Sequence, residues 1–186
     1  TPVKIIEQRS IGPTLGQESI TKSMRAGIIG LLLVVLFMVI SYGYIGLLAV
    51  AALLIYGVVS FALYRAIPIT LTLPGIAGFI LSIGMAVDSN ILIFERIKEE
   101  LRNGKSWELA MEQGFGKAWD SIRDANFTTI MAALILYNPL NSSWLPVSGI
   151  VRGFALTLGL GVVLSLFTGI VVTRTLIRVL YRRKTI

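Results

Sequence analysis

The sequence of 186 residues contains no cysteine and no histidine. Without cysteine, neither a disulfide framework nor a thiolate metal site can form. Without histidine or cysteine, the common nucleophilic triads are excluded as well. The glycines lie in apolar segments and turns, without the lysine spacing of a phosphate-binding loop. We therefore expect no enzyme activity, no metal site and no cofactor, and any proton transfer must use carboxylates, assisted by Lys, Arg or Tyr.

Charge is also scarce, since 15% of the residues are charged and 55% are hydrophobic. The apolar residues fall in long blocks, and about 20 such residues make one helical membrane crossing. The formal net charge is +7, and the basic residues sit between and after the blocks. They show no interleaving with aromatic residues, so no nucleic-acid partner is expected. The sequence predicts an all-α, polytopic membrane helix bundle surrounded by membrane lipid.

Five apolar blocks predict five transmembrane helices, at residues 26–42, 45–64, 71–94 (with Pro74 as the alternative start), 122–137 and 147–173. The continuous apolar part of the fourth block, 127–137, is short for a lipid-exposed crossing. The predicted divisions are an extracytoplasmic lead-in (1–25), helices one to three (26–95), a cytoplasmic connection (96–121), helices four and five (122–177) and a basic cytoplasmic tail (178–186).

The cytoplasmic connection contains an amphipathic helical pattern over residues 106–122. Ser106 follows an Asn-Gly-Lys break and is a suitable N-cap. Apolar residues recur at helical spacing: Trp107, Ala110, Met111, Phe115, Trp119 and Ile122. Two tryptophans on one stripe favour a helix lying at the cytoplasmic interface. A helix packed on its neighbours is the alternative.

The distribution of Lys and Arg orients the bundle. Basic residues follow the third and the fifth predicted helices, which places both of these ends in the cytoplasm. An odd number of crossings then puts the N-terminus outside, although Lys4, Arg9, Lys22 and Arg25 oppose this. The opening threonine and the outward N-terminus predict that an earlier transmembrane helix and an external domain precede this segment.

Small residues recur every four positions in two of the predicted helices. Gly78, Ser82 and Ala86 lie in the third, and Gly161, Ser165 and Gly169 lie in the fifth. Such rows allow helices to approach closely. They predict tight packing, without any further function.

Asp88 is the most informative residue, because it lies inside an apolar block. It precedes Glu95 by seven residues, which places it about 10 Å inside the cytoplasmic end of its helix. A charge at the bilayer centre costs about 2.5–3.5 kcal/mol on insertion scales. Ser89 and Asn90 add polar groups within one turn. Asp88 is therefore a candidate proton carrier, neutral in a dry interior and ionised beside water or a cation; a permanently paired structural aspartate is the alternative.

A second polar cluster marks the cytoplasmic start of the fourth predicted helix, at a similar depth. Its members are Arg123, Asp124, Asn126, Thr128 and Thr129. If this helix packs beside the third, Arg123 can supply a counter-charge to Asp88. An ordinary arginine extending to the interface is the alternative.

Four stretches carry a resemblance to a known family. They are GPTLGQESI (12–20), PGIAGFILSIGMAVDSNILIFERIKEELRNGKS (74–106), DANFTT (124–129) and GFALTLGLGVVLSLFTGIVVTRTL (153–176). The chain resembles the membrane half of the SecD family, within the RND superfamily, from about residue 12 to 176. A SecD–SecF fusion is similar over the same stretch. The run around Asp88 is the most specific, although Ser89 replaces the alanine that usually follows the aspartate.

The resemblance implies a function and partners. It implies a subunit of the bacterial Sec protein-export machinery in the cytoplasmic membrane, which uses protons as the coupling ion for late, ATP-independent movement of preproteins. The implied partners are SecF, separate or fused, and the SecYEG translocon, with YajC and YidC as further candidates and unfolded preproteins as substrates. It also implies that Asp88 belongs to the proton pathway, whereas the family's proton-transfer arginine lies on the SecF side.

Two other functions are compatible with the residues. Another RND-type transporter could export small molecules or lipids with the same proton logic. A non-transporting scaffold could hold translocon partners together, with Asp88 in a structural role.

Overall fold

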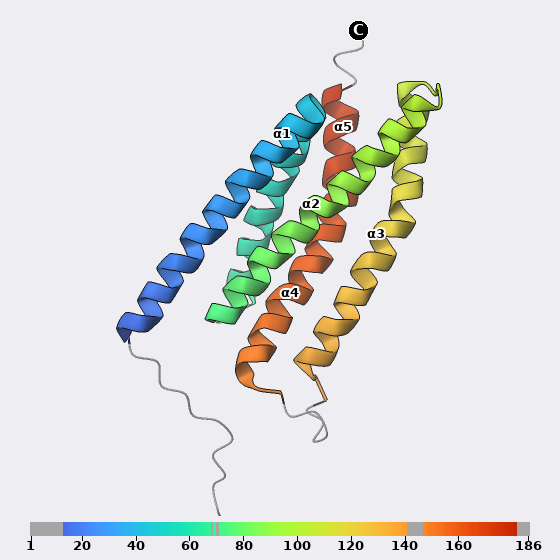
Figure 1. Cartoon of the computed structure of the whole chain (residues 1–186). Helices are drawn as coiled ribbons and strands as arrows, with labels where there is room; N and C mark the ends of the chain where they lie inside the picture. The colour runs from blue at the N-terminus through green and yellow to red at the C-terminus, as the bar shows by residue number, and fades with distance from the viewer. Residues whose placement is uncertain (1–12, 68, 70, 141–146, 182–186) are drawn as a thin grey trace, which may run out of the picture.

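A computed structural model describes residues 13–67, 69, 71–140 and 147–181 (Figure 1). In this part of the chain every element is helical: α1 (Pro13–Ala66), α2 (Leu73–Arg102), α3 (Trp107–Tyr137), α4 (Gly149–Phe167), the π-helical turn η1 (Thr168–Val172) and α5 (Thr173–Tyr181). The predicted all-α class is confirmed for these residues. Three helical stretches are long and apolar enough to cross a membrane: Gly16–Ala66, Leu73–Arg102 and Gly149–Leu180.

The element α1 consists of two helical halves that meet at Gly43. There the backbone adopts φ 56° and ψ −128°, a conformation that is open to glycine and strained for other residues. The ribbon rises from its N-terminal end to this point and then returns in the opposite direction (Figure 1). A straight helix of 54 residues would be about 80 Å long. The fold-back therefore keeps each half near the thickness of a bilayer.

The start of α1 differs from the sequence prediction. The helix begins at Pro13, so the latter part of the predicted lead-in, 1–25, is helical, whereas residues 1–12 lie outside the described part. Proline is well suited to a first helical turn. Lys22 and Glu18, one turn apart, form an ion pair at 2.8 Å that supports this polar section.

The element α2 continues well beyond its apolar part. Thr72 caps its start by accepting a hydrogen bond from the Gly75 amide at 3.2 Å. Charged residues begin at Glu95, yet the helix runs on to Arg102 before Gly104, with φ 79°, turns the chain. The first part of the predicted cytoplasmic connection is thus a helical extension of α2.

A separate interfacial helix over residues 106–122 is not formed. This segment is the first half of α3, which continues without interruption to Tyr137 and ends at Asn138 in a left-handed conformation. Gly114 does not break the helix; it lies against α2, where an added Cβ would be 2.9 Å from the Ile97 nitrogen. Most of the apolar stripe packs inward, with Ala110, Phe115 and Ile122 buried, although Trp119 is 41% exposed. The alternative of a helix packed on its neighbours therefore describes this segment.

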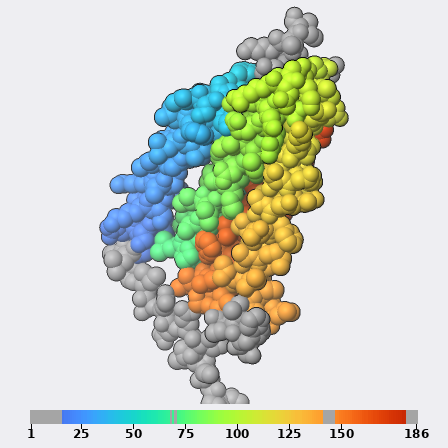
Figure 2. Space-filling view, turned by 45° about the vertical axis from the view of Figure 1, so that its right-hand side comes forward, coloured from blue at the N-terminus to red at the C-terminus, as the bar shows by residue number. Residues whose placement is uncertain are grey.

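Small residues fill the contact between α2 and α4. An added Cβ at Gly161 would lie 2.4 Å from the Ser82 Cβ, and one at Gly78 would lie 2.5 Å from the Thr157 Oγ1. Ser82 and Ser165 are fully buried. In the space-filling view, α2 and α3 lie along one face, and α4 is visible between them in the lower half (Figure 2).

The outer surface of the helices is apolar. Exposed large side chains cover α1 on both sides of Gly43 and the second half of α3, and they include Leu32, Leu33, Val58, Phe127 and Ile135. In the most apolar window of α1, only 6% of the residues are buried. This surface suits lipid rather than water.

The two ends of the bundle differ in charge. The Gly43 turn, the α2–α3 connection and the end of α5 lie at one end, and the start of α1 and the start of α4 lie at the other (Figure 1). We call the first the basic end, because it carries Arg96, Lys98, Arg102, Lys105, Lys117, Arg174 and Arg178.

Candidate functional site: a carboxylate on the outer face of α2

Asp88 lies on the outer face of α2. An exposed stripe runs along this helix at spacings of three and four, and its members are Ala77, Leu81, Gly84 and Asp88. Ser89 and Asn90 point the other way and are only 2% and 3% exposed. The apolar sequence around Asp88 does not specify which face of α2 the residue occupies. The packed side is taken by Ser82, Ala86 and Asn90, so Asp88 is outside this helix bundle rather than in its interior.

Asp88 has no polar partner in the described part of the chain. None of the hydrogen bonds or ion pairs among these residues involves its carboxylate. A carboxylate in the apolar section of a helix is costly unless water, a cation or another helix covers it. Within the described residues, no polar group offsets this cost for Asp88.

The predicted counter-charge is not formed. The helices α2 and α3 do pack together, but the Arg123 side chain is 54% exposed and contacts its own helix. Its Nε lies 3.1 Å from the Asp124 Oδ1, and its Nη1 lies 3.7 Å from the Asp120 Oδ1. Neighbouring carboxylates on α3 satisfy Arg123 locally, so it does not reach Asp88.

The other members of the second cluster also bond within α3. The Asn126 amide donates to the Ile122 carbonyl at 2.8 Å, and Asn126 is buried. The Thr128 and Thr129 hydroxyls donate to the Asp124 and Ala125 carbonyls, one turn earlier. The structure therefore does not bring this cluster together with Asp88.

Behind Asp88, a buried hydrogen bond joins α2 to the last helix. The Thr173 hydroxyl donates to the Asn90 Oδ1 at 2.7 Å, and Thr173 is fully buried. Thr173 directly follows the π-helical turn η1. Within this turn, Gly169 lies close to Ser89 of α2: a Cβ added to Gly169 would be 3.3 Å from the Ser89 Cβ. Such turns are frequent at functional sites. The sequence marked Asn90 but not Thr173, because a threonine in an apolar block gives no sign of the helix it faces.

Further polar contacts tie α1 to the α2–α4 pair. The Tyr56 Oη and the Ser82 Oγ are 2.6 Å apart, and the Tyr64 hydroxyl donates to the Thr157 carbonyl at 3.2 Å. All of these groups are satisfied within the bundle, which fixes the orientation of α2 and with it the outward direction of Asp88.

A buried ion cluster holds the basic end, and sequence analysis missed it. Glu100 is fully buried and forms ion pairs with Lys105 and Lys117, and Lys105 also donates to Gln113. Glu100 lies in the charged extension of α2, beyond its apolar section. Hydrogen bonds from Lys105 and then Lys117 lower the pKa of Glu100, and the bond to Glu100 raises the pKa of Lys117. Since Lys117 is 17 positions away, no local pattern reveals the pair.

Replacing Glu100 with Gln is expected to lower the melting temperature of the purified protein at neutral pH, because two ammonium groups lose their carboxylate. Glu100 has a lowered folded pKa, so its contribution is present above its unfolded pKa, about 4.3, and is lost as the pH falls through the folded value. The difference from wild type should therefore vanish in acid. Glu99→Gln, on the exposed side and paired with Arg96, is the matched control. An equal loss in both variants would contradict this role of Glu100.

Comparison with known proteins identifies relatives over nearly the whole chain. The sequence model of the family described as "Protein export membrane protein SecD/SecF, C-terminal" matches residues 1–183. A "Protein translocase subunit SecD" from Synechocystis is 51% identical over 179 residues, covering 96% of this chain and 36% of the relative. One from Dictyoglomus turgidum is 52% identical over 176 residues, covering 95% and 42%.

A solved structure agrees with these matches. The structure described as "Crystal structure of SecDF in Super-membrane-facing form" has a TM-score of 0.81 at 43% identity, and it covers 92% of this chain and 23% of that one. The chain thus spans well under half the length of the relatives it matches. The resemblance inferred from the motifs is confirmed, and the chain belongs to the SecD/SecF family of protein export membrane proteins.

Proposed function

We propose that this chain is the membrane part of a bacterial Sec translocase subunit, which couples proton flow to late, ATP-independent movement of preproteins across the cytoplasmic membrane. The names of its relatives support the export role. The single observation that supports proton coupling is Asp88, an exposed carboxylate in the apolar section of α2 without a partner in the described part of the chain. The role is transport, without enzyme chemistry or a cofactor.

We propose that a second helix bundle packs against the exposed face of α2 that carries Asp88. The exposed stripe around it contains the small residues Ala77 and Gly84, and an added Cβ at Gly84 meets nothing within 4 Å. Such a surface allows another helix to approach closely. The similarity to a structure described as SecDF favours a SecF bundle, separate or fused, as the partner. SecYEG, YajC and YidC are the further proposed partners in the membrane.

We propose five membrane crossings, with the basic end in the cytoplasm. The two halves of α1, the apolar part of α2, the second half of α3 and the α4–α5 run supply them. The exposed apolar residues of α3, including Phe127, Met131 and Ile135, support its crossing. By length and composition alone, α3 is not among the three helices that could span a membrane. The excess of Lys and Arg at the basic end supports the orientation. The first half of α3 then lies at the cytoplasmic interface.

The proposed cycle begins with protonation of Asp88 from one side of the membrane. Losing a charge at the bundle contact changes how well the two bundles pack, and a proton crossing the full potential supplies about 2.3 kcal/mol per 100 mV. The hydrogen bond between Thr173 and Asn90 connects α2 to α5 at this level. A change in the tilt of α2 would therefore also move the last helix. This movement of the bundle would be transmitted to an external domain. Ser89 and Asn90 serve as positioning residues and Arg123 as part of the surface of α3.

Preprotein translocation into membrane vesicles, with and without an imposed proton gradient, tests this function. A proton-driven subunit requires the Asp88 carboxyl, whereas a scaffold does not. An RND-type exporter of small molecules or lipids would leave preprotein export unaffected when the whole subunit is removed.

A further inference from the structure

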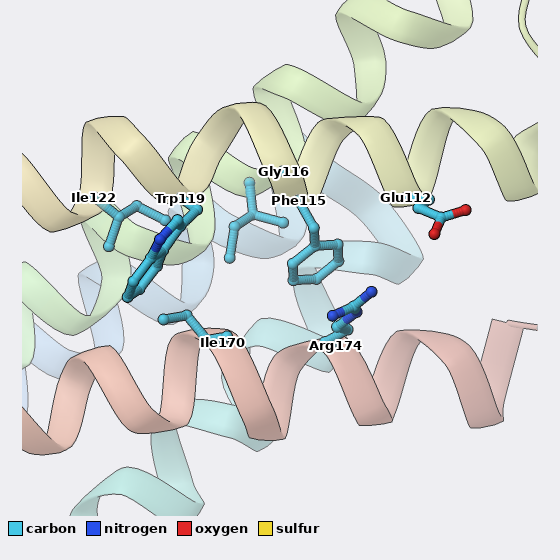
Figure 3. Close-up of a pocket in the computed structure, with 8 residues that line it drawn as sticks. Glu112, Phe115, Gly116, Trp119, Ile122, Ile170 and Arg174 are labelled. Carbon is cyan, nitrogen blue, oxygen red and sulfur yellow. The ribbon is translucent and has the colours of Figure 1, made fainter.

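A pocket of 240 Å³ lies between α3 and the η1–α5 segment, with Ile93 of α2 also in its lining (Figure 3). Its walls include Glu112, Phe115, Trp119 and Ile122 from α3, Ile170 from η1 and Arg174 from α5. It plays no part in the function proposed above.

The pocket changes from apolar to charged along its length. Ile122, Trp119 and Ile170 lie at one end, and Glu112 and Arg174 lie at the other (Figure 3). Along α3, Glu112 lies nearer to the basic end of the bundle than Ile122 does. With the membrane crossings proposed above, on which this inference rests, the charged end of the pocket faces the membrane surface and the apolar end faces the hydrocarbon. Trp119 is 41% exposed, as expected for a tryptophan at the level of lipid headgroups.

Arg174 and Glu112 are available to a ligand. The Arg174 guanidinium stacks 5.8 Å from the centre of the Phe115 ring. A guanidinium stacked in this way keeps N–H donors at its edge, where they suit a phosphate. Within the described ranges, neither Arg174 nor Glu112 forms an ion pair.

We propose that this pocket binds a phospholipid with an ammonium headgroup, phosphatidylethanolamine. Its phosphate accepts hydrogen bonds from Arg174, its ammonium pairs with Glu112, and the start of one acyl chain lies between Trp119 and Ile170. A volume of 240 Å³ equals about eight water molecules at their share of the liquid, about 30 Å³ each. The pocket therefore holds the headgroup and the first carbons of a chain, and the remaining lipid extends into the bilayer. The opposite charges at the mouth select this zwitterion.

Quenching of Trp119 by brominated lipids measures the binding. The full-length protein, with its other tryptophans, including Trp107 and Trp144, replaced by Phe, is placed in phosphatidylcholine bilayers. Three probes brominated on their chains are added in turn: phosphatidylethanolamine, phosphatidylglycerol and a phosphate-free galactosyl diacylglycerol. We expect phosphatidylethanolamine to bind best and the galactolipid to bind about tenfold more weakly, because it lacks the charged hydrogen bond to Arg174.

Three variants separate the contacts. Arg174→Gln should remove the advantage of both phospholipids over the galactolipid. Glu112→Gln should make phosphatidylethanolamine and phosphatidylglycerol equal. Gly116→Leu should remove all preference, because it fills the pocket from a position where an added Cβ meets nothing within 4 Å, which keeps the fold intact.

Two controls keep the result specific. Arg178→Gln changes an exposed charge one turn along α5, outside the pocket, and Gly30→Leu changes an exposed glycine on α1. Both should keep the wild-type order of lipids. Equal binding of the three probes in wild type, or an equal loss in Arg178→Gln and Arg174→Gln, would overturn the proposal. Proton coupling at Asp88 is untouched by either outcome.

Discussion

Replacing Asp88 with Asn is expected to abolish the part of preprotein export that depends on an imposed proton gradient. Asparagine has nearly the same shape but cannot lose or gain the proton, so the proposed contact with a second bundle would stay in one state. Export driven by ATP alone should continue at its wild-type rate. The measurement is the amount of preprotein completing translocation into vesicles that contain the full-length variant, with and without the gradient.

Matched variants make this result interpretable. Asp120→Asn removes a carboxylate that is exposed on α3 and contacts Arg123, and it should keep full gradient stimulation. Asp88→Glu keeps a titratable group and should keep part of it. Full stimulation in Asp88→Asn would leave a scaffold role and end the proton-coupling proposal.

Replacing Gly161 with Ala is expected to destabilise the bundle by about 1–3 kcal/mol, the usual cost of overpacking a tight core. The new Cβ would lie 2.4 Å from the Ser82 Cβ and 2.9 Å from the Tyr56 Oη. Either α2 must move away from α4 or the hydrogen bond between Tyr56 and Ser82 must break. Gly161→Leu should prevent this packing altogether. Thermal unfolding of the purified protein in detergent measures the change.

Gly159→Ala is the control for this prediction. It lies two positions away on α4, and an added Cβ there meets the Ala133 Cβ at 3.4 Å, an ordinary contact. Its melting temperature should remain close to that of wild type. A Gly161→Ala variant as stable as Gly159→Ala would contradict this prediction, because the α2–α4 contact would then accommodate the extra methyl group without loss of stability.

Local patterns predicted the helical class and part of the helix arrangement of the described chain. The apolar blocks predicted α2 and the α4–α5 run, and the gap between the first two blocks, 26–42 and 45–64, contains the Gly43 turn within α1. These patterns did not predict features that depend on how the helices pack together. The sequence predicted separate helices at 106–122 and 122–137, but together they form the single continuous helix α3. Polar residues at the start of α1 resemble a linker, but they form a helix.

Asp88 could be named as a candidate from the sequence, because an aspartate stands out in an apolar block, and its role in proton transfer stays a prediction. The surroundings of Asp88 could not be predicted. Its outward direction depends on which side of α2 is packed, and the predicted Arg123 partner instead contacts Asp120 and Asp124. Thr173 and Glu100 act through residues far away in sequence, on other helices. Such contacts follow from the arrangement of the helices, which periodicity alone does not give.

The protonation of Asp88 during export is the most direct measurement. Infrared difference spectroscopy of the full-length subunit with its partner, with aspartate isotope-labelled, can record the carboxylic acid band before and after a proton gradient is imposed. We predict a band that changes with the gradient and disappears in Asp88→Asn. A spectrum in which the carboxyl at position 88 keeps one protonation state at every pH and gradient would contradict the account.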